Sequence, residues 1–248
     1  MITIKDTFAQ EKMAIAGRLI AELFEKLREI IEPGMTTLMV DSFIDEYTQK
    51  NKLLSCTKGY HGYMHASCIS LNDEVVHGIP SAVTLKEGDL VKVDVCASYD
   101  NYCADMARPF FLGTPPKEVT KFMEVAQMAL DEGIQRARPG ERLGTLSATI
   151  QEVVEREGYG VVREFAGHGI GKKMHEAPEI LNYGKKGSGP LIKSGMAFAI
   201  EPMITMGDYR VYVQNDGWTV KTVDKSLAAH VEDTVIVTDN GPFIITRL

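Results

Sequence analysis

The sequence predicts a mixed fold of the α/β (α+β) class, made of two similar helix–helix–strand halves around an antiparallel sheet. Three observations predict it. Apolar residues recur with helical spacing in four segments. Two short apolar strands each end on a carboxylate, and the same order of turn, strand and acid returns later in the chain. We expect a single domain over residues 1–248, with repeat halves at about 7–111 and 115–238 related by a pseudo-two-fold axis.

The first half opens with two predicted helices. The first runs from Thr7 to Ile31, with a capping box expected from Thr7 to Gln10 and an end at Pro33-Gly34. The second helix follows directly and turns four apolar side chains inward, namely Val40, Phe43, Ile44 and Tyr47.

The second half repeats this order. A helix begins near Pro115-Pro116 and ends before Pro139-Gly140, and another runs over about 146–157 and stops at Gly158. Because both halves pair two helices with turns of the same kind, we expect each pair to cover one half of the sheet.

A matching strand follows each helix pair. The strand LVKVD comes after Gly88 and ends on Asp94, and AFAIE comes after Gly195 and ends on Glu201. Both the two glycines and the two acids are 107 positions apart. A chance match of one turn is common, but turn, strand and terminal acid together indicate a repeat.

Hairpins are predicted at two places. Asp94 and Asp105 flank a turn around residues 99–101, so that Asp94 lies opposite Asp105 if Ser98 pairs with Asn101. A register shifted around residues 100–101 is the alternative. A second hairpin is indicated by Asn-Asp-Gly at 215–217, and a strand is expected at 230–238.

The amino-acid composition limits the classes of protein to which the chain can belong. With 44% hydrophobic and 25% charged residues, the chain is typical of a water-soluble globular protein. A net charge of −7 argues against nucleic acid or an anionic membrane as the main partner. The chain has no apolar run of transmembrane length and no secretory h-region at its start. The four cysteines form no CxxC pair, so we expect reduced thiols and a cytoplasmic location.

Five residues are typical of the ligands of a two-metal site. Four carboxylates carry about four negative charges, which two divalent cations would neutralise. One imidazole among carboxylates suits manganese, iron(II) or cobalt, and zinc also fits. The candidate ligands are Asp94, Asp105, His168, Glu201 and Glu232.

Each of these residues also has an ordinary structural interpretation. Asp94 and Glu232 could be strand acids that face water, and His168 could be a structural histidine in a glycine loop. Glu201 is harder to explain so, because AFAIEPMI is strongly apolar. His230 should share the face of Glu232 two residues later, but a role for it is the less favoured interpretation.

Other histidines and cysteines leave alternatives open. His61 and His65 could line a pocket or lie in a loop, and neither His77 nor His175 has the spacing of a helical HExxH zinc motif. Cys96 and Cys103 should share the face of the two aspartates, where small buried hydrophobic residues are favoured over thiolate ligands.

Taken together, the motifs resemble the type I methionine aminopeptidases. They occur in order over essentially the whole chain as GYHGYMHASCISLNDEVVHGIP, DVCASYDNYCAD, AGHGIGKKMHEAP, AIEPM and HVEDTVIVT. The resemblance implies the pita-bread fold, with a curved antiparallel sheet around a central metal site. The length resembles the short bacterial form rather than the type II enzymes, prolidase or aminopeptidase P.

The resemblance also implies roles for single residues. Asp94 would bind one metal, Asp105 and Glu232 would bridge two, and His168 and Glu201 would complete the second. Glu201 would shuttle protons, while His77 and His175 would contact the substrate. A pocket for the initiator methionine side chain is implied at Tyr60, Tyr63, Cys68 and Trp218.

The predicted activity is removal of the N-terminal methionine from nascent proteins and peptides. The expected cofactors are two divalent ions, and the expected partners are peptide N-termini, with transient contact to the ribosome by a monomer. The chain departs from the family at Met174, where phenylalanine is usual, and over residues 101–109. The alternatives are an enzyme that cleaves X-Pro bonds and a non-catalytic peptide-binding module of the same fold.

Overall fold

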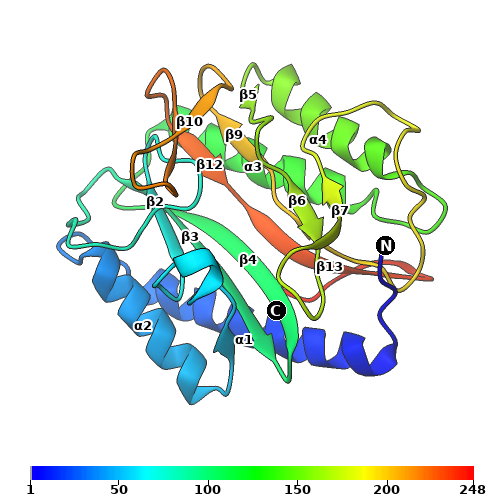
Figure 1. Ribbon diagram of the computed structural model, residues 1–248. Coiled ribbons are helices and arrows are strands. Elements are labelled where there is room, and N and C mark those ends of the chain that lie inside the picture. Colours follow the sequence, from blue (N-terminus) through cyan, green and yellow to red (C-terminus); the bar gives the residue numbers. More distant parts are fainter. Residues whose placement is uncertain (1) are drawn as a thin grey trace.

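The computed structural model describes residues 2–248, which form four long α-helices and a curled antiparallel sheet (Figure 1). A short 3₁₀ helix, η1, covers Tyr60–Gly62. The α-helices are α1 (Thr7–Ile30), α2 (Thr37–Lys50), α3 (Lys117–Ile134) and α4 (Leu143–Arg156).

The strands are short except for one long hairpin. That hairpin consists of β3 (Leu90–Tyr99) and β4 (Tyr102–Phe111). The other strands are β1 (Leu54–Ser55), β2 (Cys68–Leu71), β5 (Gly160–Val161), β6 (Gly167–Gly169), β7 (Glu176–Ile180), β8 (Ala197–Ile200), β9 (Met203–Thr205), β10 (Val211–Val213), β11 (Val220–Thr222), β12 (Ala228–His230), β13 (Glu232–Thr238) and β14 (Gly241–Ile244).

The main sheet is arranged symmetrically about β4 and β13. Its nine strands follow the order β1-β3-β4-β13-β8-β6-β7, with β2 added to β3 and β14 added to β13. α1 packs on β3 and β4, and α3 packs on β8 and β13. Figure 1 shows α1 and α2 along one half of the sheet and α3 and α4 along the other. The two helix pairs therefore cover the two halves of the sheet, which meet between β4 and β13.

The helix starts differ from the predicted ones. Oδ1 of Asp6 accepts a hydrogen bond from the backbone N–H of Ala9, so the cap precedes Thr7 and the predicted capping box is wrong. A side-chain cap does occur on α2, where Oγ1 of Thr36 accepts from the N–H of Met39. α4 begins three residues earlier than expected, at Leu143.

The register of the long hairpin corrects the preferred prediction. Asp100 and Asn101 both have left-handed backbones, with φ of 51° and 66°. They form a two-residue turn of the kind that requires positive φ at both central positions. Tyr99 therefore pairs with Tyr102, and Asp94 lies opposite Ala107 rather than Asp105. The strand also continues past Asp94 instead of ending there.

The later strands also differ in detail. The hairpin predicted around residues 215–217 is present as β10 and β11, with Val213 paired to Val220. The strand expected at 230–238 is interrupted at Val231, so that His230 closes β12 in a three-stranded sheet and Glu232 opens β13. β8 ends at Ile200, directly before Glu201.

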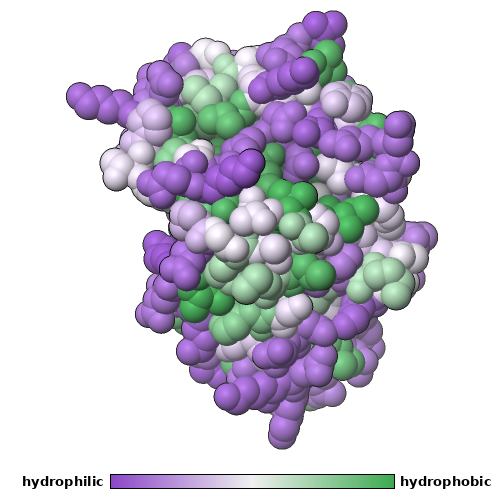
Figure 2. Space-filling view, turned by 90° about the vertical axis from the view of Figure 1, so that its left-hand side faces the viewer, coloured by the Kyte–Doolittle hydropathy of each residue, from purple (hydrophilic) through white to green (hydrophobic). Residues whose placement is uncertain are grey.

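Two apolar clusters hold the helices against the sheet. Phe24 of α1 belongs to the first cluster with β3 and β4, and Phe122 of α3 belongs to the second with Phe198 of β8. Figure 2 shows one face where white and green side chains gather in the middle and hydrophilic side chains frame them. Among the residues that the structure describes, no helix is both long and apolar enough to cross a membrane.

Candidate metal centre

The register of the main sheet places the predicted acids on one face. Ala107 of β4 pairs with Asp94 on one side and with Glu232 on the other, so the two acids stand in one row across three strands. Residues directly opposite each other in antiparallel strands share a face of the sheet. Asp105 precedes Ala107 by two residues on the same strand and therefore shares this face as well.

A second row brings His168 to the same centre. Thr234 of β13 exchanges two hydrogen bonds with the backbone of Asp105, at 2.8 Å each, and pairs with Ala199 of β8. Ala199 in turn pairs with His168 of β6. Glu201 lies two residues after Ala199, so the distant acids and the histidine meet because of strand register rather than proximity in sequence.

Glycines on both sides of His168 allow this close approach. A Cβ atom on Gly167 would lie 2.4 Å from the carbonyl oxygen of Ala199, and one on Gly169 would lie 2.2 Å from that of Ala177. Any side chain at either position would therefore push β6 away from its neighbours. The two glycines fix the imidazole between β8 and β7.

His168 is held as a neutral imidazole. Its Nδ1 lies 3.0 Å from the carbonyl oxygen of Gly169, which makes Nδ1 the protonated nitrogen. The other nitrogen, Nε2, lies 3.6 Å from Oε1 of Glu201 and 3.9 Å from Oδ2 of Asp105. Burial lowers the pKa of His168 to about 3. A neutral ring with a free lone pair towards carboxylates is the form that binds a metal.

Four acids, two of them buried and two partly buried, share this space without a basic partner. Burial, followed by the charge of Glu201, raises the pKa of Asp105 to about 7. Burial raises the pKa of Glu201 to about 8, and burial with the neighbouring acids raises the pKa values of Asp94 and Glu232 well above their usual range. Within residues 2–248, no lysine or arginine forms an ion pair with any of the four.

The donor set fits divalent cations. Oδ1 of Asp105 and Oε1 of Glu232 are buried and have no hydrogen-bond partner in the described part of the chain. Unpartnered buried carboxylate oxygens are costly unless a cation neutralises them. One ligand atom from each of Asp105, His168 and Glu232 lies within 4.8 Å of the other two. Asp94 is outside this group but lines the same cavity.

The structure places His230 closer to the acids than the sequence led us to expect. Its side chain is 2% exposed, and its Nε2 lies 3.3 Å from Oε2 of Glu201 and 3.8 Å from Oε2 of Glu232. These three residues form a second group whose ligand atoms lie within 4.8 Å of one another. Burial lowers the pKa of His230 to about 4. The spacing His-Val-Glu was the available signal, since it predicted a face shared with Glu232.

A cavity of about 270 Å³ opens beside the carboxylates. Every candidate substrate-binding residue lines it, and the rings of Tyr63 and Trp218 contact each other at 5.0 Å. Its wall thus combines aromatic and sulfur groups. The predicted residues on this wall are Tyr60, Tyr63, Cys68, His77, His175 and Trp218, and further lining residues include Thr57, Cys96, Phe165, Met174 and Met203.

Two histidines point to the cavity from opposite segments. The hydroxyl of Tyr60 lies 2.9 Å from Nδ1 of His175, and this contact orients the ring. His77 has a left-handed backbone with φ of 60°, and its ring packs against Phe165 at 5.6 Å. Burial lowers the pKa of His77 to about 4 and lowers that of His175 as well.

His61, His65, Cys56 and Cys103 do not line the cavity. Nδ1 of His65 lies 3.1 Å from Oδ2 of Asp41, which ties its loop to α2, and neither His65 nor His61 lines the cavity. Cys103 contacts Cys56 at 3.5 Å rather than the acids. All four cysteines are free thiols.

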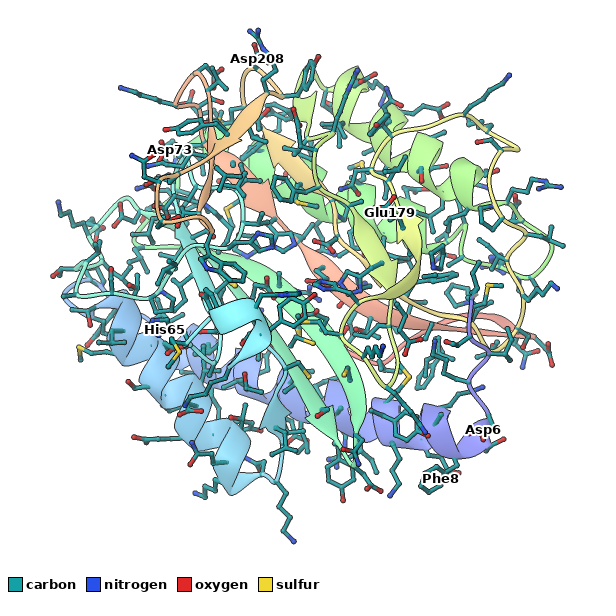
Figure 3. All side chains as sticks on the ribbon, viewed as in Figure 1. Asp6, Phe8, His65, Asp73, Glu179 and Asp208 are labelled. Atoms are coloured by element: carbon teal, nitrogen blue, oxygen red, sulfur yellow. The ribbon has the colours of Figure 1, made fainter. Side chains whose placement is uncertain are left out.

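A second cavity continues outward from the first. His168 and His175 line both cavities, together with Phe165 and Ala166. Two exposed acids, Glu164 and Glu179, line the outer cavity. Glu179 of β7 pairs directly with His168, and Figure 3 labels it beside β6 and β7. Arg163 and Glu176 line it as well, so the outer cavity adjoins the metal centre and carries net negative charge, with three glutamates and one arginine.

Comparisons with known proteins agree with this geometry. Residues 11–239 match metallopeptidase family M24. The chain is 44% identical to a methionine aminopeptidase of Clostridium acetobutylicum over 99% of both proteins, and 41% identical to that of Escherichia coli K12 over 99% of this chain and 94% of the relative. A crystal structure of methionine aminopeptidase from Thermotoga maritima superimposes with a TM-score of 0.98 at 42% identity, covering 100% of both chains.

The prolidase of Pyrococcus furiosus shares the fold at greater distance. The two structures superimpose with a TM-score of 0.79 at 25% identity. The superposition covers 99% of this chain but only 65% of the prolidase. The full-length matches to methionine aminopeptidases are therefore the more specific ones. The chain belongs to metallopeptidase family M24 and, within it, to the methionine aminopeptidases.

Proposed function

We propose that this protein removes the first residue from peptides and nascent proteins that begin with methionine. The observation that carries the proposal is the convergence of four buried or partly buried acids and His168 in the lining of an aromatic- and sulfur-lined cavity. Full-length identity of 41–44% to methionine aminopeptidases supports the same activity. Prolidase-type cleavage of X-Pro bonds is less favoured, because this chain covers only 65% of the length of the prolidase.

Two divalent cations are the proposed cofactors, held by Asp94, Asp105, His168, Glu201 and Glu232. The oxygen-rich set suits cobalt, manganese or iron(II), and zinc also fits. When bound, such ions neutralise the carboxylates and lower the pKa of a water for attack on the first peptide bond. The negative charge of these acids would attract the free amine of a substrate, which favours an exopeptidase over an endopeptidase.

Glu201 is the proposed proton shuttle. It is partly buried, borders the cavity, and lies within 3.6 Å of His168 and 3.3 Å of His230. A carboxylate in this position takes a proton from the attacking water and returns it to the leaving amine.

The two cavity histidines are proposed to hold the substrate. The Tyr60 hydroxyl contacts Nδ1 of His175, so Nε2 is the nitrogen left to stabilise the oxyanion of the tetrahedral intermediate. His77, which also lines the cavity, would bond the substrate near the scissile amide. Tyr63, Cys68 and Trp218 form the proposed pocket for the thioether side chain.

The proposed setting is the cytoplasm, where a monomer meets nascent chains and contacts the ribosome transiently. A direct test of the activity uses Met-Ala-Ser and an Ala-Pro peptide with protein that has been stripped by a chelator and reloaded with cobalt or manganese. We expect metal-dependent release of methionine and little cleavage of the Ala-Pro bond. Preferred Ala-Pro cleavage would support the prolidase alternative, and no cleavage with any metal would support the peptide-binding module.

A further inference from the structure

His230 stands out because its imidazole is buried beside carboxylates and its Nε2 has no hydrogen-bond partner in the described part of the chain. Its Nε2 is inaccessible to solvent and unpartnered within residues 2–248. The nearest carboxylate oxygen, Oε2 of Glu201, is 3.3 Å away but is not aligned for a hydrogen bond. A buried polar nitrogen without a partner is costly, so the position calls for a ligand.

The carboxylates around His230 belong to the proposed metal site. Glu201 and Glu232 each place one oxygen near Nε2, at 3.3 Å and 3.8 Å. Oε1 of Glu232 is itself unpartnered. An imidazole nitrogen and two carboxylates that converge in this way form a three-donor group of the kind that holds a transition metal.

The two three-residue groups share one acid. Asp105, His168 and Glu232 form the first group, and Glu201, His230 and Glu232 form the second. Each group thus contains one imidazole, whereas the ligand set expected from the sequence contains a single imidazole for both ions. Glu232 lies between the two histidines, which approach it from β6 and β12.

We propose that Nε2 of His230 is a sixth protein ligand of the metal centre, on the side formed by Glu201 and Glu232. The proposal rests on the proposed metal-dependent function. A second nitrogen donor makes the centre less oxygen-rich, and imidazole binds cobalt and zinc more strongly than manganese. His230 therefore shifts the preference of this side of the centre towards cobalt and zinc.

The test compares the wild-type protein with His230→Gln, in which an amide replaces the imidazole. Stripped protein is titrated with cobalt(II), zinc(II) and manganese(II) by calorimetry. The visible absorption of the cobalt form is recorded in parallel. We expect the dissociation constant of one cobalt or zinc ion to rise about ten-fold or more, with a smaller rise for manganese. The cobalt absorption bands should shift because a nitrogen donor is lost.

His65→Gln is the matched control, because His65 is bonded to Asp41 and lies outside the cavity. It should leave affinities and absorption bands unchanged. His230→Asn provides a second, smaller amide if the Gln variant folds poorly, and it should give the same loss. Wild-type affinities and an unshifted cobalt spectrum in a folded His230 variant would overturn the proposal.

The outcome is separable from the proposed function. Wild-type protein that binds cobalt but releases no methionine from Met-Ala-Ser would contradict the aminopeptidase activity, while the variant's spectrum would still decide the role of His230. If the wild-type protein is active and the His230 variants bind metal as tightly as the wild type, only the proposal of a sixth ligand is contradicted.

Discussion

The rings of His168 and His175 lie with their centroids 4.3 Å apart and their planes at 85°. Despite this contact they face different partners. Nε2 of His168 approaches the carboxylates of Asp105 and Glu201, whereas Nδ1 of His175 contacts the hydroxyl of Tyr60. Two neighbouring imidazoles should therefore respond differently to replacement.

His168→Ala should weaken metal binding sharply. The change removes the nitrogen that faces Asp105 and Glu201 and leaves their charges without a donor partner. Calorimetric titration of the stripped protein with cobalt should show at least one ion bound ten-fold or more weakly. His175→Ala is the paired control and should retain wild-type stoichiometry. An unchanged two-ion titration of His168→Ala would defeat the ligand assignment.

His77→Ala should keep the metals and lose turnover. His77 lines the cavity but belongs to neither three-residue group. If it bonds the substrate in the transition state, kcat/KM on Met-Ala-Ser should fall about 100-fold. Steady-state kinetics on protein of verified metal content measure this, and near-normal turnover would count against a substrate role.

Glu201→Gln should slow the chemical step. The amide keeps the shape and one oxygen donor but cannot carry the proton from water to the leaving amine. We expect kcat to fall by about 10² to 10⁴, with a smaller change in KM. Glu124→Gln, an exposed change on α3, is the control and should behave like the wild type. A kcat close to that of the wild type would exclude Glu201 as the shuttle.

Without metal, stability should fall as the pH rises. The pKa of Asp105 is raised to about 7 and that of Glu201 to about 8, because burial disfavours their charged forms. Between about pH 6.5 and pH 8 the folded state then binds more protons than the unfolded state, so the free energy of unfolding declines over this range. At lower pH the buried histidines, whose pKa values are lowered, offset part of this effect. Thermal unfolding of chelated protein at pH 5.5 and pH 8 tests the sign.

Added manganese should remove most of this pH dependence, because cations stabilise the ionised acids instead of protons. A chelated protein that is more stable at pH 8 than at pH 5.5 would show that the acids are not buried together in solution.

The outer cavity predicts a preference for basic residues after the cleaved bond. Glu179 is paired with His168, and like Glu164 it is exposed with no ion-pair partner in the described chain. An exposed charge pair contributes up to about 1 kcal/mol, so Met-Ala-Lys-Ser should be cleaved several-fold faster than Met-Ala-Glu-Ser at low salt. Glu179→Lys should reverse the order, and 0.5 M salt should reduce it. Glu124→Lys is the control.

The sequence predicted the elements well where a pattern repeats over many residues. The apolar stripes of α1 and α3 and the turn at Pro33-Gly34 are local features, and the structure places helices and a turn there. The family, its fold and its activity were also predicted, because the order of motifs is specific even where each motif is weak.

The predictions that failed each depended on one or two residues. The hairpin register changed because both Asp100 and Asn101 adopt the left-handed backbone, a choice that the flanking pattern does not determine. His230 was underrated for a related reason. Its distance to Glu201 is set by the pairing of β12 with β9, the strand that follows Glu201, which no local pattern reveals.

The two-residue turn at Asp100 and Asn101 limits how the chain can change in length. Successive side chains of a strand alternate between the two faces of its sheet, so one inserted residue that shifts β4 by a single step would move Asp105 to the helix-covered side. The place of Asp105 beside Glu232 would then go to Ala104. Natural variants of this enzyme should therefore lengthen the tip only where a bulge absorbs the extra residue.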